Sequence, residues 1–140
     1  MKQHMLIGEL LVQSNIILRE QVDEALEIQK TKRMRLGEIL LKFGYINSRT
    51  LTKKLSEQMD IPFIDLSQEL LDKNLVGLFP YRLLYLNNAL PLYEIENNLY
   101  VATGDPTHCE IINRLQKFTK KTIVLFCAEP RQISKLLVSL

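Results

Sequence analysis

The chain has 140 residues, of which 46% are hydrophobic and 24% are charged, and its formal net charge is +2. This fits one or two small globular units with a hydrophobic core, and the charge is too small to indicate bulk binding of DNA or RNA. No apolar run approaches the roughly 20 residues of a membrane-spanning helix, and the N-terminus lacks a signal-peptide pattern. Isolated Cys109, Cys127, His4 and His108 form no metal-ligand motif, so we expect a reduced, metal-free cytosolic protein.

The first sixty residues contain an internal repeat. A shift of 29 residues aligns 6–29 with 35–58, and six of the 24 aligned positions are identical. Most other apolar positions stay apolar, and the five residues KTKRM separate the copies. Each copy has the pattern of a short helix, a break and a second helix. We therefore expect residues 1–60 to form a tandem helical repeat of two hairpins.

The two breaks carry residues that suit a helix end. Gly44 fits the left-handed position that follows a helix, and Asn15 takes the equivalent place in the first copy. Asn47 is placed to cap the next helix through its side chain. These residue choices support the same path for both copies.

Residues 61–140 predict a small α+β unit with its own elements. We expect a short strand at 61–66, one or two short helices that include Pro80 at a helix start, and a β-hairpin turning at Asn97 and Asn98. A helix after Asp105-Pro106, a buried strand at 122–128 and a last helix opened by Pro130 complete the pattern. The expected fold class is α+β, with a tandem helical-hairpin repeat followed by a small α/β layer that contains a β-hairpin.

A glycine lies near the start of the first helix in each copy, at Gly8 and Gly37. A glycine there permits close approach to the backbone. The approaching group is either a neighbouring helix or an anion at the helix N-terminus, and packing is the more common case. Arg35, two residues before Gly37, stands at the helix end that disfavours a cation, which supports a functional role.

The repeated motif resembles a known family. RLGxx, two aliphatics, xxG, two aliphatics and xxxxLxxxLxxQ, in tandem across a five-residue spacer, is similar to the MshEN or GspE-type N-terminal domain of type II secretion and type IV pilus assembly ATPases. The tail from DIPFIDLS to the final helix also resembles this domain. The resemblance implies binding of cyclic di-GMP, and docking of the ATPase to an inner-membrane platform protein.

Residue by residue, the resemblance assigns ligand contacts in both copies. The expected contacts are Ile7, Gly8, Leu11, Val12, Asn15, Gln29, Arg35, Leu36, Gly37, Leu40, Leu41, Gly44 and Gln58. The sequence departs from the motif mildly at Asn15, Val22 and Tyr45, and substantially at Leu6, where the motif has arginine. Arginine donates two hydrogen bonds to the O6/N7 edge of guanine and leucine donates none, so one guanine of the ligand loses its reader.

Asp105 is a further candidate from the residues themselves. A carboxylate just after the hairpin can accept from the N1 and N2 hydrogens of guanine, and the alternative is an ordinary turn residue before Pro106.

The chain lacks the features of a catalytic domain. None of its five glycines is followed by lysine, so the phosphate-binding GxxxxGK[ST] loop is missing, and no nucleophile–base pair stands out. We expect a non-catalytic, metal-free regulatory domain, which either is a fragment of an ATPase or stands alone. Three readings stay open: a cyclic di-GMP sensor, a docking domain for a platform protein, and a structural domain with a degenerate site.

Overall fold

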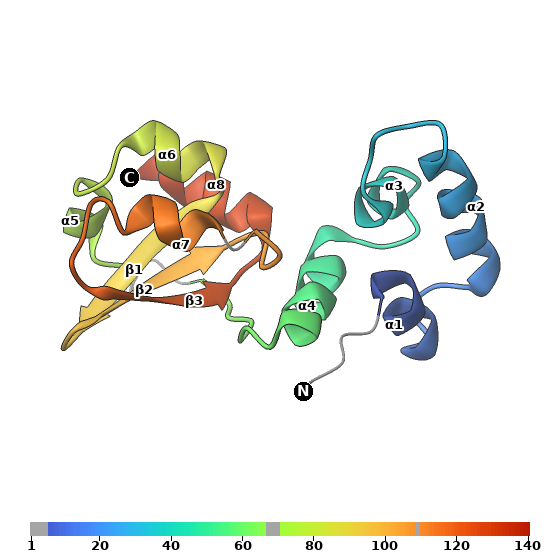
Figure 1. Ribbon diagram of the computed structural model, residues 1–140, viewed down its shortest axis with the longest axis horizontal. Helices are drawn as coiled ribbons and strands as arrows, with labels where there is room; N and C mark the ends of the chain where they lie inside the picture. Colours follow the sequence, from blue (N-terminus) through green and yellow to red (C-terminus); the bar gives the residue numbers. More distant parts are fainter. Residues whose placement is uncertain (1–5, 67–70, 109) are drawn as a thin grey trace.

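The computed structural model describes residues 6–66, 71–108 and 110–140, so His4 and Cys109 lie outside the described residues. Four helices come first, and a three-stranded sheet with further helices follows (Figure 1). The fold class is therefore α+β, as predicted. The first four helices are α1 (Ile7–Gln13), α2 (Arg19–Gln29), α3 (Leu36–Lys42) and α4 (Ser48–Met59).

The two copies of the repeat have the same secondary structure. Helices α1 and α3 begin and end 29 residues apart, and α2 and α4 begin 29 residues apart. The prediction of two equivalent helix–break–helix units is confirmed. The repeated apolar positions account for this, because three equivalent pairs, Leu11 with Leu40, Ile17 with Ile46 and Val22 with Leu51, are buried in a common core. The buried members of that core are Leu11, Ile17, Val22, Ala25, Ile39, Leu40, Ile46 and Leu51.

Each first helix ends in a Schellman motif. Asn15 has a φ of 58° and Gly44 a φ of 74°, so both adopt the left-handed conformation that the sequence predicts. The amides of Asn15 and Ile16 donate to the carbonyls of Val12 and Leu11. The amides of Gly44 and Tyr45 repeat this pattern at Leu41 and Leu40. The chain is thereby turned in the same way before α2 and before α4.

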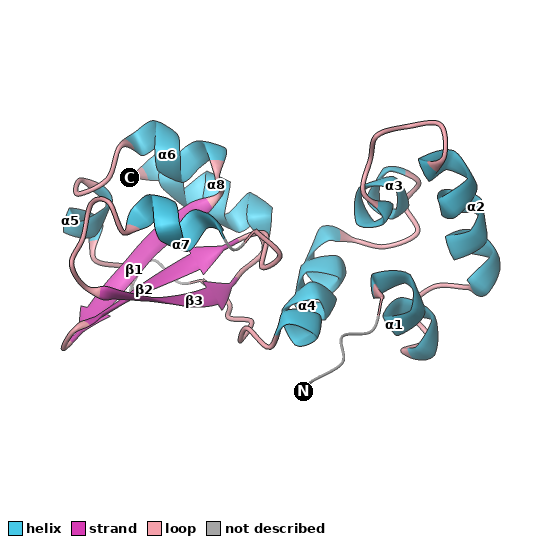
Figure 2. Cartoon of the chain, viewed as in Figure 1, coloured by secondary structure: helices cyan, strands magenta, loops and turns pink. Residues whose placement is uncertain are grey.

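The second half is built on a small mixed sheet (Figure 2). Strands β1 (Ala89–Ile95) and β2 (Asn98–Thr103) form the predicted hairpin, and β3 (Thr122–Cys127) pairs with β2 in parallel, in the order β1-β2-β3. Helix α7 provides the crossover that a parallel pair requires. The helices of this half are α5 (Lys73–Val76), α6 (Tyr81–Leu86), α7 (Glu110–Leu115) and α8 (Pro130–Ser139).

Two local predictions for the second half are wrong. Residues 61–66 form no strand, because only one bridge, from Phe63 to Cys127, joins them to the sheet. The hairpin turns at Glu96 and Asn97 rather than at Asn97 and Asn98, and Glu96 takes the left-handed conformation with a φ of 54°. In the observed register Asn98 pairs with Ile95, so Asn98 belongs to β2 and not to the turn. Pro130 does open α8, as predicted.

Helix α4 connects the repeat to the sheet (Figure 1). The Cys127 thiol at the end of β3 donates to the Thr52 carbonyl at 3.8 Å. The Ser48 hydroxyl, in the first turn of α4, donates to Glu129, the N-cap of α8, at 2.7 Å. These contacts fix the start of α4 beside the carboxyl end of the sheet, where the loop after β2 also lies.

Candidate functional site

A pocket of about 500 Å³ lies between the second copy of the repeat and the loop that follows β2. One wall comes from the N-terminus of α3 and one face of α4, and the opposite wall comes from the loop at Gly104–Thr107. The first copy contributes one residue, Ile7. The full lining is Ile7, Arg35, Leu36, Gly37, Glu38, Leu41, Ser48, Leu51, Thr52, Leu55, Gln58, Asn88, Gly104, Asp105, Thr107 and Pro130.

Arg35 spans the pocket from the start of α3. Its Nη1 lies 2.9 Å from Asp105 Oδ2, in an ion pair, and 3.2 Å from Thr107 Oγ1. Its Nε donates to Glu38 Oε1 at 3.3 Å. The side chain nevertheless remains 65% exposed, so the guanidinium is held in place and is still accessible from solvent. The contact between Arg35 and Asp105 joins residues 70 positions apart, and no local sequence pattern predicts it.

The charges of this pair stabilise each other. The hydrogen bond from Arg35 to Asp105 raises the pKa of the guanidinium above its ordinary value. Burial alone would raise the pKa of Asp105, but hydrogen bonds from Thr107 and Arg35 and the charge of Arg35 outweigh burial and hold that pKa below its usual range. Asp105 is therefore an ionised acceptor at neutral pH.

Gly37 and Gly8 are explained by packing between the helices of each hairpin. A Cβ on Gly37 would lie 3.0 Å from Leu51 Cδ2, and a Cβ on Gly8 would lie 3.1 Å from Val22 Cγ1. Val22 and Leu51 are equivalent positions in the two copies. A Cβ on Gly8 would also lie 3.1 Å from Leu36 Cδ2 of the other copy, so each glycine makes room for the side chains of neighbouring helices, which is the packing alternative. Gly37 also lines the pocket, so its role as a neighbour of a ligand is compatible with this packing.

The pocket gathers half of the residues that the sequence nominated. Seven lie in its wall: Ile7, Arg35, Leu36, Gly37, Leu41, Gln58 and Asp105. The other seven lie outside it: Gly8, Leu11, Val12, Asn15, Gln29, Leu40 and Gly44. Leu11 and Leu40 are fully buried in the helical core. Asn15 and Gly44 end helices, and the Gln29 amide donates to the Met34 carbonyl at 3.1 Å.

Several polar residues that line the pocket were not predicted from the sequence. Thr107 hydrogen-bonds the Asp105 carboxylate through its amide at 3.0 Å, and the run Asp-Pro-Thr is a sequence signal for such a turn. No sequence pattern marks Asn88 as a pocket residue. It reaches the pocket because it immediately precedes β1 and the sheet places it there. Its Nδ2 donates to Pro130 O and Ser134 Oγ, and its carbonyl accepts from the Gly104 amide. Asn88 thereby positions the loop that carries Asp105.

The described residues contain no cluster of histidine, cysteine, aspartate or glutamate able to hold a metal ion. Burial raises the pKa of the Cys127 thiol to about 12, so this group is protonated and is no nucleophile at neutral pH. Within the described ranges, no helix is long and apolar enough to cross a membrane. The pocket offers recognition chemistry: a guanidinium, a carboxylate, a hydroxyl and apolar walls.

Comparisons with known proteins agree with this architecture. The sequence profile of the MshEN domain matches residues 59–140. The type IV pilus assembly ATPase PilB of Myxococcus xanthus (strain DK1622) is 31% identical over 113 residues, which are 81% of this chain and 20% of that protein. The chain thus spans about a fifth of the length of this curated relative.

Solved structures extend the similarity over almost the whole chain. The structure of MshE with cdg has a TM-score of 0.83 and 26% identity, and the match covers 96% of this chain and 98% of that one. The N-terminal domain of XpsE, in crystal form I4122, has the same fold, with a TM-score of 0.61 and 19% identity over 99% of this chain and 98% of that one. Together with the profile match, these similarities show that the chain belongs to the MshEN domain family, the N-terminal domains of GspE-, PilB- and MshE-type secretion and pilus ATPases.

Proposed function

We propose that this chain is the non-catalytic regulatory domain of a type IV pilus or type II secretion ATPase and that it binds cyclic di-GMP in the Arg35 pocket. The observation that carries the proposal is the meeting of Arg35 and Asp105 across a pocket of about 500 Å³. The similarity to MshE, whose structure was solved with cdg, supports the choice of ligand. The site would act in the cytoplasm, with the ATPase domain in the same protein and without DNA or RNA.

The pocket has the groups that a guanine base requires. Guanine presents the O6 and N7 acceptors on one edge, which suit the guanidinium of Arg35. Its N1 and N2 hydrogens are donors, which suit the ionised carboxylate of Asp105. Ile7, Leu36 and Leu41 provide apolar surface for the faces of the base.

In the free protein, Arg35 and Asp105 bind each other, and a ligand would exchange that pair for contacts with the base. Breaking this ion pair costs little free energy, because the Arg35 side chain is 65% exposed. Exposed ion pairs contribute only about 0.2–1 kcal/mol. Each residue would then satisfy a complementary edge of guanine.

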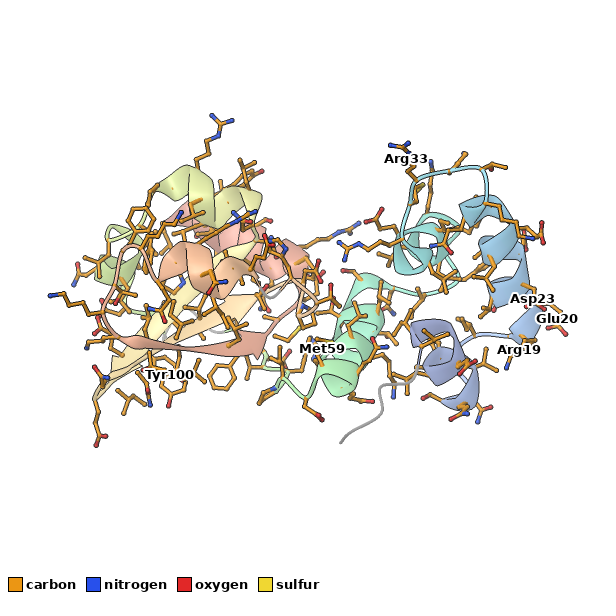
Figure 3. All side chains as sticks on the ribbon, viewed as in Figure 1. Arg19, Glu20, Asp23, Arg33, Met59 and Tyr100 are labelled. Carbon is orange, nitrogen blue, oxygen red and sulfur yellow. The ribbon has the colours of Figure 1, made fainter. Side chains whose placement is uncertain are left out.

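Calorimetric titration with cyclic di-GMP tests the proposal, with GTP and cyclic di-AMP as ligand controls. We expect Arg35→Ala to weaken binding by about 1–3 kcal/mol, the cost of a lost bidentate guanine contact. Arg33→Ala is the matched control, because Arg33 lies on the loop between α2 and α3, outside the pocket lining (Figure 3). Undetectable binding to the wild-type domain, or equal losses in both variants, would contradict the proposed site.

Docking to an inner-membrane platform protein is a second candidate, and exposed apolar side chains favour it. Tyr81 and Tyr85 on α6 stack with ring centroids 6.0 Å apart and are 49% and 46% exposed. Leu78 and Leu86 beside them are 54% and 66% exposed. Such a patch is typical of a partner surface. We therefore propose the short helices after the repeat as the docking surface.

A binding assay with the cytoplasmic part of the platform protein tests the second candidate. Tyr81→Ser with Tyr85→Ser should abolish binding, while Leu18→Ser, an exposed position on the repeat, should leave it unchanged. Retention of binding by the folded tyrosine variant would exclude this surface.

We also propose that the chain divides into units 1–60 and 61–140, because its buried residues form two clusters, one in each unit.

A further inference from the structure

We infer that the pocket reads only one of the two bases of a cyclic dinucleotide, so that one guanine is sufficient for recognition. This inference rests on the proposed function and concerns the ligand class of the same site. It follows from the difference between the two copies of the repeat at the position expected to contact the base, which is Leu6 in the first copy and Arg35 in the second.

The backbone is the same at the two reading positions. Arg35 precedes α3 with φ and ψ of −71° and 151°, and Leu6 precedes α1 with −61° and 143°. The next residues, Leu36 and Ile7, both line the pocket. A side chain at position 6 therefore leaves its helix as Arg35 does, and it starts from a residue adjacent to the pocket wall.

The chemistry differs between these positions. Leu6 is 71% exposed and has no donor for the O6/N7 edge of guanine. The first motif contains one cation, Arg19, which lies at the outer end of α2 and does not line the pocket (Figure 3). Gln29, the polar residue that ends the motif, uses its amide to hold the Met34 carbonyl. No described residue of the first copy therefore supplies a base-reading donor to the pocket.

The second copy distinguishes guanine from adenine at its end of the pocket. Arg35 has donors only, and adenine presents its N6 amino donor where guanine has the O6 acceptor. An adenine there would leave donors facing each other. Ile7, which is the residue that the first copy adds to the lining, offers apolar contact, which every base can make. One guanine is thus selected and the other base is tolerated.

Calorimetry with three cyclic dinucleotides tests this on the wild-type chain. We expect 3′,3′-cyclic GMP-AMP to bind within about fivefold of cyclic di-GMP, including the twofold statistical advantage of a ligand with two guanines. Cyclic di-AMP should bind at least tenfold more weakly than either. If cyclic GMP-AMP loses more than fivefold, both bases are read and the inference is wrong. If none of the three binds, the proposed function itself fails.

Leu6→Arg provides the second arm of the experiment. An arginine there should restore a reader for the second guanine and make the chain prefer cyclic di-GMP over cyclic GMP-AMP by at least tenfold, the change in equilibrium constant for about 1.4 kcal/mol, within the range for one bidentate pair. Leu6→Met is the matched control, because it replaces the exposed leucine by a side chain that has no hydrogen-bond donor, and it should leave the ratio within fivefold. An unchanged ratio in the folded Leu6→Arg variant would show that position 6 does not face the second base.

Discussion

The two copies of the repeat share a backbone and differ in what they present to the pocket. Both have a left-handed residue after their first helix, at Asn15 and Gly44, and both bury an equivalent leucine, Leu11 and Leu40, completely. The second copy supplies a wall of the pocket, with Arg35 paired to Asp105. The first copy supplies Ile7 alone.

The difference shows that the core and the site are separate properties of one motif. The buried core positions are apolar in both copies with one exception, where Ala25 is matched by Lys54. The residues just before the helices are exposed, and there the copies have diverged, with Leu6 and Leu18 in the first copy and Arg35 and Asn47 in the second. A motif match therefore predicts the fold of a copy more securely than its ligand contacts.

The largest expected effect concerns what the copies share. Leu11→Ala and Leu40→Ala should each lower the free energy of unfolding by about 2–5 kcal/mol, because both side chains are fully buried in one core. Urea unfolding followed by circular dichroism measures both. A difference between the two variants of more than about 2 kcal/mol would show that the copies do not contribute equally to the core.

The helix ends offer a sharper distinction. Gly44→Ala should destabilise by about 1–2 kcal/mol, because an L-residue is strained at a φ of 74° although nothing lies within 4 Å of the added carbon. Asn15→Gly should be neutral or slightly stabilising, because glycine adopts the same conformation without strain. Thermal unfolding of both variants provides the measurement. Equal destabilisation by both substitutions would contradict the equivalence of the two turns.

The residues that precede α2 and α4 differ in their ability to cap the helix. The Asn47 side chain accepts from the Thr50 amide at 2.8 Å, whereas Leu18, its equivalent, has no acceptor for such a bond. We expect Asn47→Ala to cost about 1 kcal/mol and Leu18→Asn to stabilise by up to that amount. Chemical unfolding of the two variants compares the caps. A destabilising Leu18→Asn would show that the leucine, which is 63% exposed, has a contact worth more than a cap.

The smallest expected effect belongs to the ion pair that only the second copy makes. Asp105→Asn should lower stability by about 0.2–1 kcal/mol at neutral pH, because Arg35 is largely exposed. The pKa of Asp105 is lower in the folded state, so its contribution is fully present above the unfolded value of about 3.9 and disappears as the pH falls through the folded value.

Unfolding of wild type and Asp105→Asn between pH 3 and pH 7 measures this contribution. Asp23→Asn is the control, because Asp23 lies on the outer side of α2 (Figure 3), and it should change stability by less than about 0.5 kcal/mol. A wild-type advantage that persisted unchanged to the lowest pH would show that the charge of Asp105 is not its source.

Much of this molecule is determined by local sequence. The helix ends at Asn15 and Gly44, the cap at Asn47 and the start of α8 at Pro130 could all be predicted, because each depends on the conformational preference of one residue and its near neighbours. The repeat made the first four helices easier to predict, because the same apolar pattern occurs in both copies. The strand expected at 61–66 failed because a single bridge to β3 holds that segment, and pairing partners are not encoded locally.

The site depended on the tertiary structure. The motif assigned thirteen residues to the ligand without distinguishing those that face it from those, such as Leu11 and Leu40, that fill the core. The contact of Arg35 with Asp105 and the arrival of Asn88 at the pocket depend on where α4 meets the sheet. Local preferences act over a few residues, whereas a pocket forms from side chains that packing alone brings together.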